Sequence, residues 1–172
     1  MHLKIEEISK HHDRKGFDCG VSELNQFLQL QARQKAEKNI AKTYVAIWDS
    51  SPTNILGYYT LTGYSVIVPP DYKQYRNYPH PLNAVKLARL AVSRDHQGQH
   101  LGEKLLIDAI YRTVLVSEQI SSIGIFVDPT TPHVTSFYKQ YGFLLADSGT
   151  PDALEMWLPI KTCIEVIKKT NL

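Results

Sequence analysis

One stretch of the chain constrains its fold more than any other: the residues from Ala88 to Leu106, which read ARLAVSRDHQGQHLGEKLL. Residues 85–92 form a largely apolar run typical of a strand, and the spacing of apolar residues predicts a helix from Gly98 to about Val116. Gly98 and Gly102 lie at the point where the strand turns into the helix. A strand that turns through glycines into a helix directs free backbone N–H groups and the positive end of the helix dipole toward one point. This is the arrangement of a pyrophosphate cradle, although an ordinary turn explains these residues alone equally well.

The remaining segments predict a mixed α/β chain. Alternating or β-branched runs indicate strands, and the 3.6-residue period indicates helices. The strands are expected at 3–8, 43–48, 55–62, 64–68, 85–92, 122–127, 143–146 and 154–158. Helices are expected at 22–38, with Ser22 as the N-cap, and at 98–116, 132–141 (closed by Gly142) and 162–169. Residues 69–84 have no period and are expected to form a long loop.

Composition narrows the class of protein. A length of 172 residues, with 43% hydrophobic and 21% charged residues, predicts one globular domain over 1–172. The formal net charge of +2 neither requires nor excludes a nucleic-acid partner, because local patches matter more than the sum. Cys19 and Cys163 lie far apart, which favours a reducing, cytoplasmic setting. No run approaches the ~18 apolar residues of a membrane span, so we expect no membrane association.

A second motif, SFYKQYGF at Ser136 to Phe143, follows about 35 residues after the glycine turn. Together the two motifs resemble the signatures of the GNAT acetyltransferase family. The order of FDCGVSELNQFLQLQARQ, YVAIW, GYYTLTGYSV, LARLAVSRDHQGQHLG and FYKQYGF is similar to the toxin branch of that family. Those toxins acetylate aminoacyl-tRNA and are paired with a ribbon-helix-helix antitoxin. The resemblance covers roughly residues 3–160 and implies a mostly antiparallel sheet, splayed near its centre, with helices on both faces.

The resemblance also implies site residues. It implies that the backbone of Leu90, Ala91 and Val92 pairs with the pantetheine arm of acetyl-CoA, and that Tyr138 is the general acid for the departing thiolate. A phenol of pKa ~10 protonates a thiolate only when it lies beside the sulfur. Arg89 is implied to support the site or to contact the substrate. The amides around Gln97, Gly98, Gln99, His100, Leu101 and Gly102 are implied to hold the pyrophosphate, and Glu103 is included among the cofactor-binding residues.

Two positions depart from the family pattern. His100 stands where the family most often has glycine, and its side chain either crowds the pyrophosphate or adds a charge to it. Val134 replaces a small alanine four residues before the tyrosine. No obligatory carboxylate base is evident in the sequence. An α-amine of pKa ~7.7–8.0 is partly neutral near pH 7.4 and needs no strong base, unlike a lysine of pKa ~10.4.

Several residues also have plainer interpretations. Tyr138 fits a helix tyrosine packed on a sheet, and Cys19 fits a small apolar residue beneath the first helix. His2, His11 and His12 lack the spacing of metal ligands, so we expect no metal site. Basic residues form either a solvated surface or a phosphate contact, and Lys35, Lys38, Lys86 and Arg89 are the candidates for substrate binding. The wider basic set is Arg33, Lys42, Lys73, Arg76 and Arg94. The tyrosines of the 69–84 loop either stack on bases or pack the loop down.

These observations predict an acetyl-CoA-dependent N-acetyltransferase whose acceptor is the α-amine of an aminoacyl-tRNA, so that acetylation blocks translation. The alternatives are an acetyltransferase of a protein or small-molecule amine, and a non-catalytic binding module with the same fold. Analogy with the toxin branch predicts a homodimer and a ribbon-helix-helix antitoxin as partners.

Overall fold

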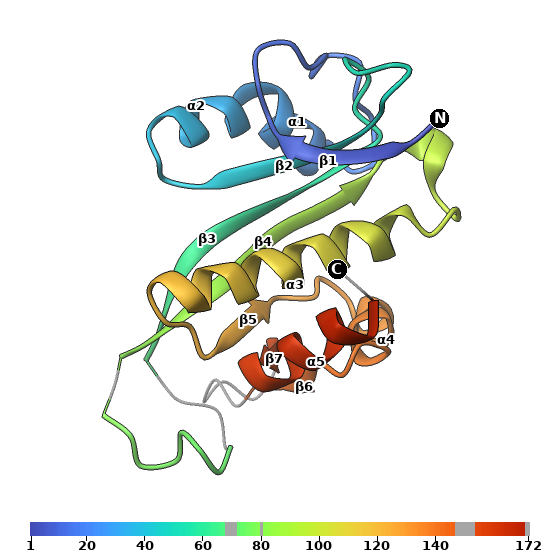
Figure 1. Cartoon of the computed structure of the whole chain (residues 1–172). Coiled ribbons are helices and arrows are strands. Elements are labelled where there is room, and N and C mark those ends of the chain that lie inside the picture. Colours follow the sequence, from blue (N-terminus) through green and yellow to red (C-terminus); the bar gives the residue numbers. More distant parts are fainter. Residues whose placement is uncertain (68–71, 80, 147–153, 171–172) are drawn as a thin grey trace. The chain divides into compact units, whose positions relative to one another are not determined.

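The computed structural model describes residues 1–67, 72–79, 81–146 and 154–170, and the chain forms two compact units (Figure 1). The first unit is Met1–Thr62 with Ala88–Ala109, and the second is Gly63–Leu87 with Ile110–Leu172. Strands β3 (Gly57–Val66) and β4 (Leu82–Val92) and helix α3 (Leu101–Gln119) contribute residues to both. The sequence-based expectation of a single domain over 1–172 stays a prediction.

The first unit is built on strands in the hydrogen-bonded order β1-β2-β3-β4. Strand β1 (Leu3–Glu7) pairs antiparallel with β2 (Lys42–Trp48), and β2 pairs antiparallel with β3. These pairings confirm the predicted strands at 3–8, 43–48 and 55–62. The expected strand at 64–68 is the continuation of β3 to Val66, and residue 68 lies outside the described part of the chain.

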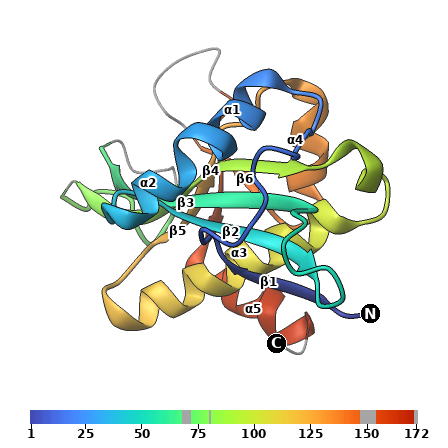
Figure 2. The same cartoon turned by 90° about the horizontal axis from the view of Figure 1, so that it is seen from above.

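Helices cover both faces of the strands in the first unit (Figures 1 and 2). Tyr58 and Tyr59 are neighbours on β3, and their side chains point to opposite faces because a strand has a two-residue period. The Tyr58 hydroxyl donates to the carbonyl of Leu24 on α1 (Ser22–Leu30) at 2.8 Å, whereas the Tyr59 hydroxyl donates to Asp108 on α3 at 2.5 Å. The apolar core under α1 comprises Ile8, Phe17, Cys19, Phe27, Leu28, Ala32, Val45, Ile47, Ile55, Tyr58 and Ala91.

Two helices in the structure differ from the sequence prediction in where they begin or whether they are continuous. The helix expected at 22–38 is divided into α1 and α2 (Ala32–Glu37), because Gln31 adopts φ −124° and ψ −33°. Ser22 is the first helical residue and not the N-cap; Val21 holds that position, without a capping side-chain hydrogen bond. The helix expected from Gly98 begins at Leu101, because Gly98 and His100 adopt positive φ angles that a right-handed helix excludes.

The second unit has strands in the hydrogen-bonded order β4-β5-β7-β6. Strand β5 (Gly124–Val127) runs parallel to β4, and β7 (Met156–Pro159) runs antiparallel to β5 and to the short β6 (Leu144–Leu145). The expected strands at 122–127 and 154–158 and the final hairpin are therefore confirmed, with its turn at 147–153 outside the described residues. Strand β4 begins at Leu82, inside the loop expected at 69–84.

Besides the C-terminal half of α3, the described part of the second unit contains helices α4 (Pro132–Lys139) and α5 (Ile160–Thr170). Helix α4 begins at residue 132, as predicted. The structure adds its cap: the side chain of Thr131 accepts from the backbone N–H of Val134, and Pro132 occupies the first turn. Gly142 adopts φ +92° just beyond the helix. Across the described ranges, none of the helices combines the length and the apolar character that crossing a membrane demands.

Candidate active site

The last residues of β4 and the turn that follows form one candidate binding element, inside the first unit. Ala91 is buried in the core under α1, and Leu90 and Val92 are partly buried. The strand end is fixed by the N–H of Ser93, which donates to the carbonyl of Leu56 at 2.9 Å. A 3-10 turn, η1 (Arg94–His96), leads from there into the glycine segment.

Left-handed residues shape the glycine segment between η1 and α3. Gly98 has φ +78° and His100 has φ +63°, and a Cβ added at Gly98 would meet nothing within 4 Å. The chain therefore turns sharply twice before Leu101, so that Leu101, Gly102 and Glu103 form the first turn of α3. The backbone N–H groups of a first helical turn lack intrahelical acceptors and attract anions. The segment thus has the geometry expected of a phosphate cradle.

The side chains of His100 and Gln97 are not arranged to bind a phosphate. His100 is 83% exposed, and its Nδ1 lies 3.4 Å from a carboxylate oxygen of Glu103. The Gln97 side chain instead donates from Nε2 to the carbonyls of Cys19, at 3.0 Å, and Val92, at 2.9 Å. An amide nitrogen has only two hydrogens, so both Gln97 donors are used within the protein. Any contact of this segment with a phosphate is thus expected from its backbone.

Tyr138 lies on α4, in the second unit, and the residue is only 4% exposed. The rings of Phe137 and Phe143 contact it edge-on, with centroids 5.2 Å and 5.3 Å away. Among the residues that the structure describes, the Tyr138 hydroxyl has no hydrogen-bond partner. Burial raises the pKa of Tyr138 to about 12, so the phenol keeps its proton throughout the physiological range.

A buried hydroxyl without a partner is costly, and it is uncommon in proteins. Such a group is explained when a ligand supplies the missing partner. The sulfur of a thioester, or of the thiolate formed from it, is a suitable acceptor for this O–H. The Tyr138 environment and the backbone cradle therefore both fit acetyl-CoA, each by a feature of its own unit.

Three of the basic residues expected to contact substrate lie in the first unit, and two of them lie near an aromatic ring. The Arg89 guanidinium lies 3.7 Å from the centroid of the Phe27 ring, and the Lys35 ammonium lies 5.5 Å from the same centroid. Lys38, just beyond α2, is exposed. These three residues belong to the first unit.

Lys86, in the second unit, is engaged by acidic neighbours. Its Nζ lies 2.9 Å from Glu155 and 2.8 Å from Asp128, and it stands 4.5 Å from the centroid of the Tyr64 ring. Glu155 also accepts a hydrogen bond from the Tyr64 hydroxyl at 2.7 Å. With its side chain only 15% exposed, Lys86 supports the packing of β4 against its neighbours.

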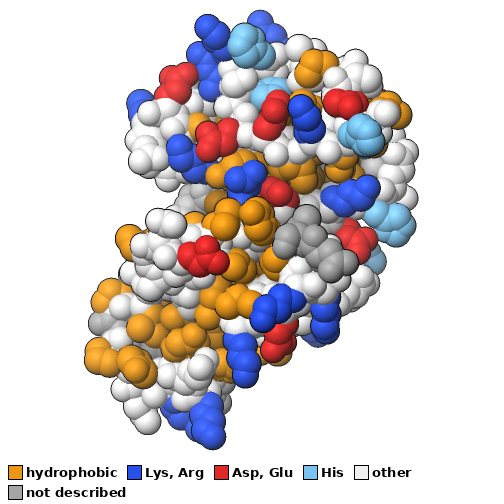
Figure 3. Space-filling view, in the orientation of Figure 1, with side chains coloured by type: hydrophobic (Ala, Val, Ile, Leu, Met, Phe, Trp, Pro, Cys, Tyr) orange, Lys and Arg blue, Asp and Glu red, His pale blue; other side chains and the backbone are white. Residues whose placement is uncertain are grey.

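The tyrosines that follow residue 71 divide between two roles. Tyr72 and Tyr75 pack edge-on against Trp157, with centroids 5.3 Å and 6.0 Å away, whereas Tyr78 is 58% exposed. Figure 3 shows hydrophobic side chains, a class that includes tyrosine, over the lower part of the second unit, with Lys or Arg side chains at its tip. Packing therefore explains two of these tyrosines but not the third.

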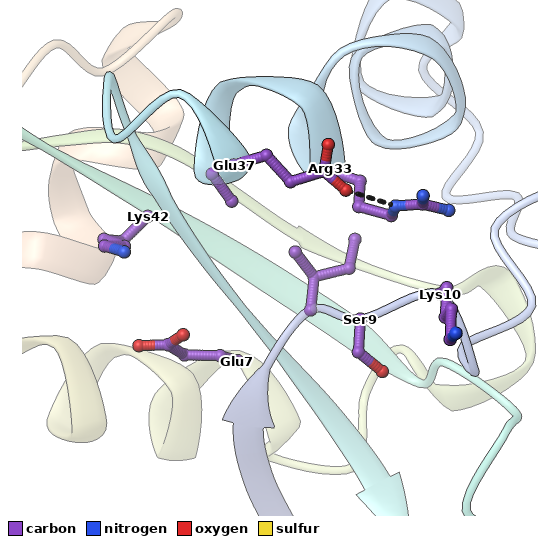
Figure 4. Close-up of a pocket in the computed structure, with 8 residues that line it drawn as sticks. Glu7, Ser9, Lys10, Arg33, Glu37 and Lys42 are labelled. Carbon is purple, nitrogen blue, oxygen red and sulfur yellow. Dashed lines mark hydrogen bonds and ion pairs between the residues drawn. The ribbon is translucent and has the colours of Figure 1, made fainter.

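One pocket of the first unit lies apart from the glycine segment (Figure 4). Helix α2 contributes Arg33 and Glu37, which form an ion pair at 3.0 Å across its rim. The full lining comprises Glu7, Ile8, Ser9, Lys10, Arg33, Ala36, Glu37 and Lys42. Its charges are of both signs, so it does not form a continuous basic surface.

Comparison with known proteins identifies the class. A family model described as an acetyltransferase (GNAT) domain matches residues 39–144, which is more than half of the chain. The chain therefore belongs to the GNAT family of acetyltransferases, and its mixed, mostly antiparallel sheet with helices is the fold of that family. The fold class predicted from the sequence is confirmed.

Individual relatives are similar along nearly the whole chain. A tRNA-acetylating toxin of Mycobacterium tuberculosis is 30% identical over 155 residues, which cover 90% of each chain. The solved structure of AtaT complexed with acetyl-methionyl-tRNAfMet is 28% identical, with a TM-score of 0.85 and coverage of 97% of this chain and 99% of that one. A tyrosine-to-phenylalanine mutant of the toxin AtaT, bound to the C-terminus of the antitoxin AtaR and acetyl-CoA, is 25% identical, with a TM-score of 0.79 and coverage of 98% and 99%.

Proposed function

We propose that this protein transfers the acetyl group of acetyl-CoA to the α-amine of an aminoacyl-tRNA and thereby acts as a toxin that blocks translation. One observation carries the catalytic part of the proposal: the hydroxyl of Tyr138 is buried, protonated and without a partner among the described residues. The similarity to a tRNA-acetylating toxin and to AtaT in complex with acetyl-methionyl-tRNA supports the choice of acceptor.

Acetyl-CoA binding is assigned to the first unit. The backbone of Leu90, Ala91 and Val92 is proposed to pair with the pantetheine arm. The pyrophosphate is assigned to the backbone N–H groups of residues 97–103, where the positive φ angles of Gly98 and His100 precede the first turn of α3. The side chain of His100 is 83% exposed and lies beside Glu103.

The transfer itself needs no covalent enzyme intermediate. The neutral α-amine attacks the thioester carbonyl, a C–N bond forms, and the C–S bond breaks. The Tyr138 hydroxyl gives its proton to the departing sulfur, and the proton lost by the amine restores the phenol through solvent. A phenol with a raised pKa is a weak acid, so proton transfer must accompany C–S cleavage, in surroundings where burial also makes the thiolate more basic.

For the RNA contact, the structure favours some predicted residues over others. Lys38 is exposed and Lys35 and Arg89 meet at the ring of Phe27, so these three are the proposed phosphate or acceptor-end contacts. Tyr78 and Lys73 are both exposed, and they offer a ring for base stacking and a cation for phosphate. Lys86 remains a candidate only if substrate displaces Glu155 or Asp128.

The proposed reaction also indicates where the protein acts and which partners it has. Because acetyl-CoA and charged tRNA are cytoplasmic, the proposed reaction takes place in the cytoplasm. A homodimer and an antitoxin of the ribbon-helix-helix type are proposed by analogy with the toxin branch, and the AtaT structure bound to the C-terminus of AtaR supports an antitoxin partner.

The test offers the purified protein radiolabelled acetyl-CoA together with total aminoacylated tRNA, deacylated tRNA, peptides and polyamines in parallel. The expected result is label on aminoacylated tRNA only, recovered as an N-acetylated amino acid after the ester is hydrolysed. Label confined to peptides or amines would make the protein an acetyltransferase of those acceptors. Absence of both label and acetyl-CoA binding would instead leave a non-catalytic member of the fold.

A further inference from the structure

The loop before α1 and the glycine segment are joined by a continuous set of hydrogen bonds in the first unit. The set begins at Asp18, whose Oδ1 accepts from the N–H of Gly20 and from the side-chain amide of Asn25, both at 2.9 Å. The other end of the Asn25 side chain, Oδ1, accepts from the N–H of Cys19 at 2.8 Å. One side chain of α1 thus fixes both residues 18 and 19.

From this loop the bonds pass directly to the segment after β4. The carbonyl of Asp18 accepts from the N–H of Arg94 at 2.9 Å, and the carbonyl of Cys19 accepts from the Gln97 side chain at 3.0 Å. Gln97 also donates to Val92, the last residue of β4, at 2.9 Å. The Asp18 carboxylate lies 3.5 Å from Arg94 Nε as well. Residues 92, 94 and 97 are therefore held at three points, immediately before Gly98.

A phosphate cradle made of backbone N–H groups works only if its backbone is fixed before the ligand arrives. The cradle segment has no core side chains of its own: residues 97–100 are all exposed. It also contains two left-handed residues, one of which, His100, is not glycine. Its shape must therefore be imposed from outside, and the contacts with residues 18, 19 and 25 supply that constraint.

We propose that Asn25 and Gln97 are positioning residues that hold the glycine segment in the shape that binds the pyrophosphate of acetyl-CoA. This inference rests on the proposed binding of acetyl-CoA, and it adds a supporting role of the Gln97 side chain to the backbone contact proposed for residues 97–103. Neither side chain needs to touch the cofactor. Asn25 acts across the whole set because it orders the two residues whose carbonyls receive Arg94 and Gln97.

The test compares two acetyl donors that differ in the 3′-phosphoadenosine diphosphate portion, which contains the pyrophosphate. Acetyl-CoA contains it, and acetyl-pantetheine does not, although both carry the same thioester. We expect Gln97→Ala to lower kcat/KM for acetyl-CoA by about tenfold while kcat at saturation stays the same. For acetyl-pantetheine, kcat/KM is expected to change by less than about twofold. Gln97 is exposed, so loss of folding is not expected, and circular dichroism and the melting temperature verify this.

A second variant separates hydrogen bonding from packing. Asn25→Asp keeps the size of the side chain and the acceptor for Cys19, but it replaces the donor to Asp18 by a second carboxylate. The Gly20 N–H, followed by the Asn25 amide, lowers the pKa of Asp18, so Asp18 is ionised and the two carboxylates repel. We expect the same donor-selective loss as in Gln97→Ala. Gln26→Ala is the matched control, because Gln26 is an exposed neighbour on α1 whose side chain donates to Ser22 at 3.3 Å, away from the loop before α1.

Two results would overturn the inference: unchanged kcat/KM for acetyl-CoA in Gln97→Ala and Asn25→Asp, or an equal loss with acetyl-pantetheine. Failure of the proposed function gives a different result, because the unmodified protein would then use neither donor. The wild-type measurement therefore distinguishes an incorrect role for Asn25 and Gln97 from an incorrect reaction.

Discussion

The two units present their candidate functional groups in opposite ways. In the first unit, the candidate element is backbone: exposed residues 97–100 with left-handed φ angles at Gly98 and His100, ordered by side chains that bond to carbonyls. In the second, it is one side chain, the Tyr138 phenol, enclosed by aromatic rings and lacking a hydrogen-bond partner in the described ranges.

This difference suggests that the first unit binds acetyl-CoA and that the second supplies the proton for the reaction. Backbone N–H groups recognise phosphate by charge and shape and exchange no protons during acetyl transfer. A buried phenol recognises little but holds one proton where desolvation keeps it. Substitutions in the first unit should therefore change the affinity for acetyl-CoA, and substitution of Tyr138 should change kcat.

The largest effect is expected from Tyr138→Phe. The phenyl ring keeps its contacts with Phe137 and Phe143, and only the proton donor is lost, so kcat should fall by ~10²–10⁴-fold with KM for acetyl-CoA nearly unchanged. Tyr141→Phe, which removes a hydroxyl three residues further on, is the matched control. Steady-state kinetics with charged tRNA measures both constants. A loss of kcat of less than about fivefold would remove Tyr138 from the role of general acid.

The pH profile tests the same residue without a mutation. The acceptor α-amine, of pKa ~7.7–8.0, must be neutral to attack, so kcat/KM should rise about tenfold per pH unit up to ~7.5 and then level. Because the pKa of Tyr138 is raised to about 12, its proton is retained and no decline is expected up to pH ~10. An amide-linked aminoacyl nucleotide avoids ester hydrolysis during the measurement. A descending limb below pH ~9 would mean that the acid is a group other than this buried phenol.

The affinity for acetyl-CoA should respond to Gly98→Ala. Alanine at φ +78° costs ~1–2 kcal/mol, although its Cβ meets nothing within 4 Å, so the turn is either strained or shifted. We expect the Kd for acetyl-CoA, measured by calorimetry, to rise about tenfold with kcat nearly unchanged. Gly63→Ala is the control, because Gly63 also has open space but no positive φ. An equal rise in both variants would deny a special role to the turn.

The sequence predicted those parts of the molecule that local patterns determine. A β-branched and aromatic run located the strand at Thr43–Trp48, and the motif FYKQYGF placed Tyr138 on a short helix that precedes Gly142. The start of α3 was predicted three residues early, because a histidine in the left-handed region has no sequence signal.

Contacts between distant residues lay beyond that prediction. Gln97 meets Cys19 across 78 positions, and Lys86 meets Glu155 across 69, and the residue types alone do not select these partners among many. Lys86 was assigned to the substrate from sequence, whereas the structure engages its side chain with Glu155 and Asp128. Gln97 was assigned to the pyrophosphate through the amides of its segment, and its side chain bonds within the protein. The FDCG loop and Asn25 were visible as a motif, but only the hydrogen bonds show what they hold.

The smallest expected effect concerns the residue in which the chain departs most from its family pattern. His100 adopts φ +63°, a conformation that favours glycine, but glycine also loses more entropy on folding, so His100→Gly should stabilise the protein by only ~0.5 kcal/mol. Its side chain is 83% exposed and directed to Glu103, so the Kd for acetyl-CoA should change by less than about twofold. Thermal unfolding and calorimetry measure the two quantities. A large loss of affinity would show that the imidazole contacts the pyrophosphate. Binding in the first unit would then depend on a side chain, just as the proposed chemistry in the second unit depends on Tyr138.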